Sequence, residues 1–249
     1  MVTPAPIYTF AKMAFVIVPA GKFIMGSNEI EDDNSAPQPE HEVELNYDFY
    51  MARFPVTNQE FTRSIRGLLF SDDEANCAVV GISWHQAQTY VAWLNKKYSE
   101  ELPANHRFRL PSEAEWEKAA RGKNGNIYPW GNNFDSKKCN TAYGGFGRPS
   151  RVEHYSPHGA SPYDCADMAG NVWEWTRSIW GNEYERAAFK YPYNPNDGRE
   201  DDTSSLMRVL RGGSFADPPE NARCAVRYAE EPDKRFGNIG LRIAITPDI

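Results

Sequence analysis

The stretch DMAGNVWEWT, Asp167 to Thr176, contains two tryptophans, Trp173 and Trp175, on either side of a single carboxylate, Glu174. Successive side chains of a β-strand point to opposite faces, so we expect the two indoles on one face and Glu174 on the other. A carboxylate fixed between bulky aromatic residues is costly unless something pairs with it. The sequence therefore predicts a partner for Glu174.

A bend with the sequence Ala-Gly-Asn leads into these tryptophans, and Asp167 lies seven residues before Glu174. Two carboxylates and the carbonyl oxygens of a turn are the ligands that a hard cation such as Ca²⁺ prefers. The alternative interpretation is that Glu174 caps backbone N–H groups within a tight turn. The stretch alone leaves both interpretations open.

The composition narrows the classes of function. The chain has 249 residues, which suits one large domain or two small ones, and its formal charge is −7. The acidic balance argues against nucleic-acid partners and anionic membrane surfaces. No apolar run is long enough to span a bilayer, and the N-terminus lacks the basic start of a signal peptide, so we expect a cytoplasmic protein without membrane insertion. Secretion stays open if the sequence is truncated.

The cysteines and histidines show no metal-binding spacing. Cys77, Cys139, Cys165 and Cys224 form no C-x-x-C pair, and the five histidines form no H-x-x-x-H pair. Zinc is therefore not expected. Four cysteines in a chain of this length do not make a disulfide scaffold, although one or two bridges stay open.

Three helices are predicted from one local device, the capping box S/T-x-x-E/Q. The boxes are Thr57 with Glu60, Ser83 with Gln86, and Ser112 with Glu115. Short strands are expected around the Pro-Ala-Gly turn of FVIVPAGKFIMGS, in HEVELNYDFYMARF, in RVLRGGSF, in CAVRYA and in IGLRIAI. From 123 to 205 the chain is rich in Gly, Asn, Pro and aromatic residues, which predicts long ordered loops. The pattern indicates one α+β domain over residues 1–249.

Eight landmarks then coincide in order: FVIVPAGKFIMGS, FPVTNQEF, VVGISWHQAQTYVAWLN, RFRLPSEAEWEKAARG, YPWGN, DMAGNVWEWT, RVLRGGSF and GNIGLRIA. The chain resembles the family of formylglycine-generating enzymes, or sulfatase-modifying factors, from about residue 15 to 244. The resemblance implies a single domain with a variant of the C-type lectin fold that contains much irregular structure.

The resemblance also implies a structural calcium at the opening stretch. Its ligands would be Asp167, Gly170, Val172 and Glu174, with main-chain carbonyls from the middle two. The enzymes hold a second calcium in the loop after the YPWGN segment. Here Asn140 and Thr141 remain, but no acidic residue stands at the expected distance, so this second site is not expected.

The catalytic part of the family pattern is missing. The enzymes oxidise a cysteine of a substrate peptide with copper and O₂, and two nearby cysteines bind the metal, because thiolates suit Cu(I). Here RGGSFADPPENARCAVRYAEEP contains only Cys224, which we interpret as a small buried residue. No catalytic residue and no copper are therefore expected. The alternative, a formylglycine-generating oxidase with a relocated site that acts on a sulfatase cysteine, stays open.

We therefore expect a non-catalytic module that binds a protein or another macromolecule through its C-terminal segment. The chain is similar there to the variable proteins of diversity-generating retroelements, whose diversified positions derive from adenine-rich codons. The matching positions can all arise from an asparagine codon by changes of its adenines: Phe215, Ala216, Asp217, Ala229, Phe236, Gly237 and Asn238. Tyr228 and Arg235 are further expected anchors of the ligand, because aromatic residues and arginine dominate binding energies. An ordinary undiversified surface is the alternative.

Overall fold

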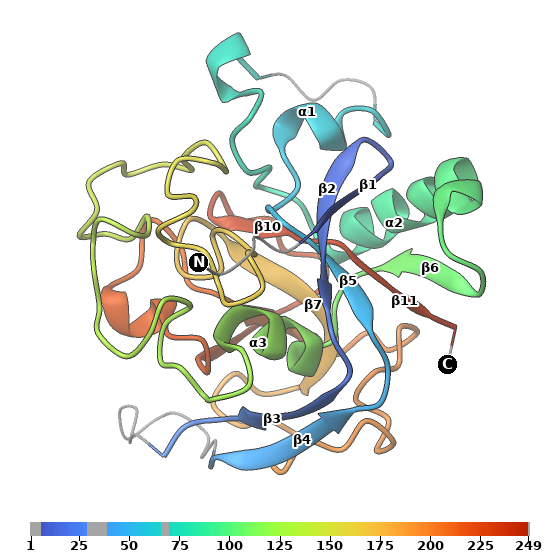
Figure 1. Ribbon diagram of the computed structural model, residues 1–249, viewed down its shortest axis with the longest axis vertical. Helices are drawn as coiled ribbons and strands as arrows, with labels where there is room; N and C mark the ends of the chain where they lie inside the picture. The colour runs from blue at the N-terminus through green and yellow to red at the C-terminus, as the bar shows by residue number, and fades with distance from the viewer. Residues whose placement is uncertain (1–5, 29–38, 66–69, 249) are drawn as a thin grey trace.

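The computed structural model describes residues 6–28, 39–65 and 70–248 (Figure 1). The strands are β1 (Ile7–Phe10), β2 (Met13–Val18), β3 (Gly21–Met25), β4 (His41–Leu45), β5 (Phe49–Ala52), β6 (His106–Arg109), β7 (Trp173–Gly181), β8 (Met207–Arg211), β9 (Arg227–Glu230), β10 (Ile239–Leu241) and β11 (Ala244–Pro247). The α-helices are α1 (Asn58–Phe61), α2 (Trp84–Tyr98) and α3 (Glu113–Arg121), and the 3₁₀ turns are η1 (Asp72–Glu74), η2 (Ser99–Glu101) and η3 (Pro219–Ala222).

The strands form three sheets. A five-stranded sheet has the order β1-β2-β5-β11-β6, a four-stranded sheet has the order β10-β7-β8-β9, and β3 pairs with β4. The first sheet combines strands from both ends of the chain, because β11 pairs with β5 and with β6. In the second sheet, β10 runs parallel to β7, whereas β8 lies antiparallel to both β7 and β9. This second sheet carries the DMAGNVWEWT and RVLRGGSF segments.

The predicted capping boxes are confirmed at all three helices. In each one the N-cap hydroxyl accepts a hydrogen bond from the backbone N–H three residues later, and the later side chain binds the N-cap N–H. A fourth box, Ser71 with Glu74, starts η1 and was not predicted. Each box satisfies N–H groups that would otherwise lack partners, so these short helices begin where the sequence indicates.

Two apolar clusters make up most of the core. One joins α2 to the inner faces of both larger sheets and contains Trp173, Trp175 and Leu210. The other surrounds α3 and the β3–β4 pair and contains Trp116. Trp84 on α2 and Trp116 on α3 are core residues, 2% and 0% exposed. Trp93 is half-buried and packs against the first cluster from outside.

Helix α3 is buried around its whole circumference, and this includes its charged residues. Each of its three carboxylates is paired with arginine: Glu113 with Arg199 and Arg227, Glu115 with Arg109, and Glu117 with Arg121 and Arg211. A buried charge without a partner is very costly, so these pairs determine where α3 can sit. The helix therefore connects loop segments to both β8 and β9.

The predicted strand segments are confirmed with one difference. The strands on either side of the Pro-Ala-Gly turn, β2 and β3, do not pair with each other but belong to different sheets, and the same holds for β4 and β5. The predicted irregular region is confirmed from 123 to 172, where the described residues form turns and isolated bridges (green to yellow in Figure 1). Between 173 and 181 it is interrupted by β7.

Candidate functional site

The carboxylate of Glu174 has the predicted partner, and it is Arg242. The arginine Nε lies 3.1 and 3.0 Å from Oε1 and Oε2, and its Nη2 lies 2.8 Å from Oε1. The indole Nε1 of Trp116 donates a further hydrogen bond of 2.6 Å to Oε2. Both residues of the ion pair are fully buried. Each carboxylate oxygen thus accepts two donors, which uses the lone pairs that it can offer.

Arg242 is satisfied just as completely. Its remaining N–H groups donate to the carbonyl oxygens of Ala52, Arg53 and Ala166 at 2.7 to 2.9 Å. The guanidinium therefore joins the end of β5, the loop before the Asp167 turn and strand β7. Trp173 and Trp175 point into the apolar core on the other side of the strand, as the alternation predicts.

These contacts do not fit Glu174 as a ligand of calcium, because Arg242 already supplies the positive charge. Asp167 is buried near this pair, and its side chain accepts a hydrogen bond from Asn171 Nδ2 at 3.3 Å. Burial raises the pKa of Asp167 to about 7. The carbonyl of Gly170 accepts the N–H of Val172 at 3.0 Å. No group of three or more acidic, histidine or cysteine residues in the described ranges could hold a metal. The calcium site stays a prediction, and the geometry argues against Glu174 as one of its ligands.

The cysteines are free thiols without an activating environment. Cys139, Cys165 and Cys224 are buried, and burial raises the pKa of each thiol to about 12. Cys224 is 0% exposed and lies in the turn before β9 rather than within a strand, with its N–H bound to the carbonyl of Ile127 at 2.8 Å. A thiol in this setting is a structural residue, since the thiolate is the metal ligand and nucleophile.

The structure brings most of the predicted ligand-binding residues to one end of the four-stranded sheet, where β7, β9 and β10 begin and β8 ends. Tyr228 on β9 is 49% exposed, and its ring stacks on that of Trp173, with centroids 5.5 Å apart. The carbonyl of Asn238 accepts the N–H of Trp173 at 2.9 Å. Phe236 is 45% exposed and, together with Arg235 and Gly237, lies in the exposed turn before β10.

A polar turn after β8 forms the neighbouring part of this surface. The Ser214 hydroxyl bonds to the carboxylate of Asp217 and also accepts the amide of Asn238 at 3.2 Å. Ala216 is exposed, whereas Phe215 is half-buried and its N–H donates to the carbonyl of Asn171 at 3.0 Å. The turn is therefore rigidly attached to the bend that precedes β7.

The prediction for Ala229 is wrong. Its side chain is 3% exposed and packs with Trp180, Met207 and Val209 on the opposite face of the sheet. The reason is the alternation along β9, which places Tyr228 and Ala229 on opposite sides. We define the candidate surface by its remaining residues and by the indole beneath Tyr228: Trp173, Phe215, Ala216, Asp217, Tyr228, Arg235, Phe236, Gly237 and Asn238.

Two flanking segments were not predicted. The loop that carries Tyr143, a residue 72% exposed, is attached to the surface because the N–H of Ala142 donates to the carbonyl of Asp217 at 2.9 Å. On the other side, the hydroxyl of Tyr184 donates to Glu230 on β9 at 2.6 Å. The glycines around Tyr143 in the sequence AYGGFG indicate an exposed loop. No sequence pattern near Ala142 indicates that this loop contacts Asp217.

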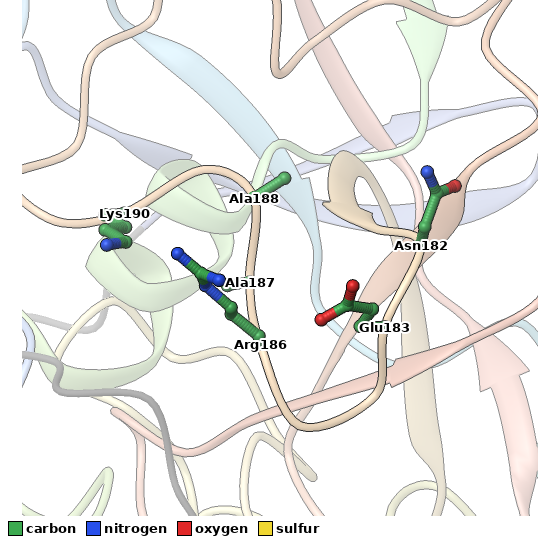
Figure 2. A pocket seen from close by; sticks show the side chains of 6 residues that line it. All are labelled: Asn182, Glu183, Arg186, Ala187, Ala188 and Lys190. Atoms are coloured by element: carbon green, nitrogen blue, oxygen red, sulfur yellow. The ribbon is translucent and has the colours of Figure 1, made fainter.

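The Tyr184 loop encloses a small open hollow of about 260 Å³. Figure 2 shows Asn182 and Glu183 on one side of this loop and Arg186 and Lys190 on the other. The charged residues lining the hollow are exposed. We interpret it as a surface feature of the loop that flanks β9.

Three features define the class of protein: the mixed helix and strand architecture, the long ordered loops, and the buried ion pair of Glu174 with Arg242. It is the formylglycine-generating-enzyme-like variant of the C-type lectin fold, as expected. The family described as the sulfatase-modifying factor enzyme 1-like domain matches residues 4–247. The chain therefore belongs to this family.

Two related sequences and one solved structure are similar to this chain over most of its length. An inactive C-alpha-formylglycine-generating enzyme 2 of Bos taurus is 30% identical over 92% of this chain and 87% of its own length. The serine/threonine-protein kinase pkn1 of Chlamydia caviae is 28% identical over 98% of this chain, which spans only 39% of that relative. The structure of Treponema denticola variable protein 1 has a TM-score of 0.76 at 21% identity and covers 98% of this chain and 100% of its own. This last likeness concerns the fold.

Proposed function

We propose that this protein is a non-catalytic module that binds a protein or another macromolecule through the candidate surface. The observation that carries the proposal is the exposed ring of Tyr228, stacked on the buried ring of Trp173. An aromatic residue fixed in this way offers a large contact area and loses little conformational entropy on binding. Interfaces commonly depend on a few such anchors.

The surroundings of Tyr228 support recognition of a macromolecule. Phe236 adds a second exposed aromatic ring, and the turn from Ser214 to Asp217 adds polar groups whose positions are fixed by hydrogen bonds. Tyr228 stands on strand β9, and the other groups belong to short turns at the ends of β8 and β10, so a packed sheet holds all of them. Binding residues concentrate in loops that a rigid scaffold positions.

The environment of the cysteines favours binding over the oxidase alternative. Copper-dependent oxidation in this family requires two neighbouring thiolates, and the segment after β8 provides one cysteine, which is buried. We therefore expect that copper-loaded protein does not turn over a sulfatase-type cysteine peptide. Turnover of that peptide would establish the oxidase alternative instead.

A more specific form of the proposal is a variable protein of a diversity-generating retroelement. Ala216, Phe236 and Gly237 are exposed, so other side chains at these positions would leave the core unchanged. Ala229 would not be diversified, because a larger side chain would clash in the small cluster around Trp180. Variation among strains at 215–217 and 236–238 with a constant Ala229, next to a reverse transcriptase gene and a template repeat, is the expected genomic pattern.

The binding surface can be tested without knowing the natural partner. Peptides selected from a displayed random library on the wild-type protein are retested on Tyr228→Ala and Phe236→Ala variants. The matched control is Ile7→Ala, since Ile7 is 52% exposed on the edge strand of the other sheet. Loss of one good anchor costs about 2 kcal/mol, so we expect about thirty-fold weaker binding to each surface variant and unchanged binding to the control.

Folding of each variant is checked by its circular dichroism and thermal transition. If folded Tyr228→Ala and Phe236→Ala proteins bind the selected peptides as tightly as the wild type, the preferred binding surface lies elsewhere and the proposal fails.

A further inference from the structure

A second hollow lies away from the candidate surface, at the end of the molecule where the β1–β2 turn meets α1 (Figure 1). Its volume is about 440 Å³, which is in the range of small-molecule sites. It is lined by the β1–β2 turn, by the segment from Phe54 through α1, and by two loop segments. Its charged lining residues are Lys12, Glu60, Arg63 and Glu153, and its neutral polar ones are Thr57, Gln59 and Asn76.

The β1–β2 turn has an unusual conformation for its sequence. Its central residues, Ala11 and Lys12, have φ angles of +49° and +61°, a combination that normally selects Asn-Gly. Side chains from elsewhere hold this turn in place. Glu101 accepts the N–H of Ala11 at 2.6 Å, and Arg63 donates to the carbonyl of Ala11 at 2.9 Å. The strained turn is thus fixed from both sides, with Lys12 lining the hollow.

The wall of the hollow also contains carboxylates. One oxygen of Glu60, Oε2, accepts the N–H of Thr57 at 2.9 Å in the capping box. Glu60 is half-buried, and burial raises the pKa of its carboxyl, while Thr57 and the nearby charge of Arg63 act in the opposite direction. Glu60 therefore contributes a half-buried carboxylate to the wall of the hollow.

Glu153 forms the acidic end of the hollow. The N–H of Val152 donates to the carbonyl of Asn76 at 3.1 Å, and the N–H of Asn58 donates to the carbonyl of Cys77 at 3.0 Å. These contacts place the 152–153 segment beside the start of α1, whereas Lys12 lies beside its end, where Arg63 binds the turn. The hollow therefore has a basic end at the β1–β2 turn, with Lys12, and an acidic end at the 152–153 segment, with Glu153, while Glu60 and Arg63 lie between them and close to each other.

We propose that this hollow binds a small zwitterion of the amino-acid or dipeptide class. The carboxylate of the ligand pairs with Lys12, and its ammonium group pairs with Glu60 and Glu153. The amides of Gln59 and Asn76 offer further hydrogen bonds, and Phe54 and Val152 provide apolar wall. Because the charges of the lining cancel, a ligand with only one charge leaves one end of the hollow unpaired. Arg63 acts as a positioning residue for Lys12.

The test is isothermal titration of the whole protein with a panel of free amino acids and dipeptides. Each is compared with its ethyl ester, which lacks the carboxylate, and with its N-acetyl derivative, which lacks the ammonium group. We expect at least one free zwitterion to bind, and both derivatives to bind about ten-fold more weakly or worse, since each loses a charge-assisted hydrogen bond.

Two variants assign the binding to this hollow. Glu60→Gln removes the charge and keeps the capping box, because glutamine also serves at that position. Lys12→Gln removes the basic end. Each should weaken binding about ten-fold, whereas Lys22→Gln, in the exposed pair with Glu42 on β3 and β4, should leave it unchanged.

The proposal is overturned if no member of the panel binds at millimolar concentration. It is also overturned if the esters and N-acetyl derivatives bind as well as the free zwitterions, or if folded Glu60→Gln and Lys12→Gln proteins bind like the wild type. None of these outcomes affects the surface around Tyr228, which the displayed peptides test separately.

Discussion

At the scale of single residues, the pair formed by Glu174 and Arg242 explains why a carboxylate can stand between two core tryptophans. Both charges are removed from water, and each has its hydrogen-bonding capacity filled by protein groups. Such a pair adds little net stability compared with apolar residues, but removal of one partner leaves a buried charge alone. The local fold therefore has to bring Glu174 and Arg242 together, since neither charge can be buried alone.

We expect Glu174→Gln to lower the free energy of unfolding by about 3 kcal/mol, because Arg242 then keeps its charge without a compensating carboxylate. The matched control is Glu42→Gln in the exposed pair with Lys22, which should cost less than about 1 kcal/mol. Urea unfolding of both variants gives the comparison. Equal, small losses for the two variants would mean that Arg242 finds another partner.

Calcium gives a separate prediction at the same turn. Since Arg242 neutralises Glu174, the predicted calcium would be held by Asp167 and the turn carbonyls, and its removal by a strong chelator should lower the melting temperature of the wild type, whereas an unchanged melting temperature would contradict the site. A ligand that binds only the folded state would raise the melting temperature by mass action. A clear fall on chelation, with calcium present in the purified protein, would show that Asp167 and the turn carbonyls do bind the ion.

Asp167 should make stability depend on pH in a defined direction. Burial raises its pKa to about 7 in the folded state, above the usual value of 3.8, so the folded protein holds this proton more tightly than the unfolded chain. Its contribution is therefore present below about pH 4 and is lost as the pH rises toward 7. We expect Asp167→Asn to remove this loss, so that the stability difference between variant and wild type grows in favour of the variant from pH 4 to 7. A flat difference across this range, measured by urea unfolding, would contradict the raised pKa.

At the scale of elements, the bend that leads into β7 depends on Gly170. Its φ is +76°, and a Cβ atom there would lie 2.3 Å from the carbonyl oxygen of Asn140. Gly81 has a similar φ of +72° with nothing within 4 Å of a Cβ. We expect Gly81→Ala to cost about 1 kcal/mol for its backbone conformation alone, and Gly170→Ala to cost at least about 2 kcal/mol more because of the clash. Thermal unfolding of the two variants, side by side, measures the difference, and equal losses would mean that the bend can move away from Asn140.

The same elements show what the sequence can predict. Capping boxes and strand alternation act within a few residues, so the three helix starts and the opposite faces of Trp173 and Glu174 were predictable. The partners of the α3 carboxylates were not. Glu113 pairs with Arg199 and Arg227, which lie 86 and 114 residues away, and no local pattern marks such a pairing. For Ala229 a local signal does exist, because it alternates with the exposed Tyr228 along β9 and strand periodicity places it on the buried face, whereas a codon comparison carries no information about burial.

At the scale of the whole molecule, the candidate surface depends on contacts between distant parts of the chain. Its Trp173 follows the irregular region, its Phe236 accepts the N–H of Gly81, and its Asp217 accepts the N–H of Ala142 at 2.9 Å. The surface is therefore assembled only when the complete domain is folded. Its rigidity comes from this convergence of segments rather than from any one strand.

The same convergence predicts a single cooperative unfolding transition. The five-stranded sheet joins β1 and β2 to β11, and Arg242 near the end of the chain binds carbonyl oxygens at Ala52, Arg53 and Ala166. A cut in the irregular region between 123 and 172 would leave the four-stranded sheet whole in the C-terminal fragment, but it would divide the five-stranded sheet, because β11 would lie on one fragment and its neighbours β5 and β6 on the other. We expect calorimetric and van't Hoff enthalpies of unfolding to agree, as they do for single cooperative domains.

Limited proteolysis should give either intact protein or nicked protein that stays associated. Two fragments that separate and each keep a cooperative transition would show two domains, and the surface around Tyr228 would then have to be explained within the C-terminal one.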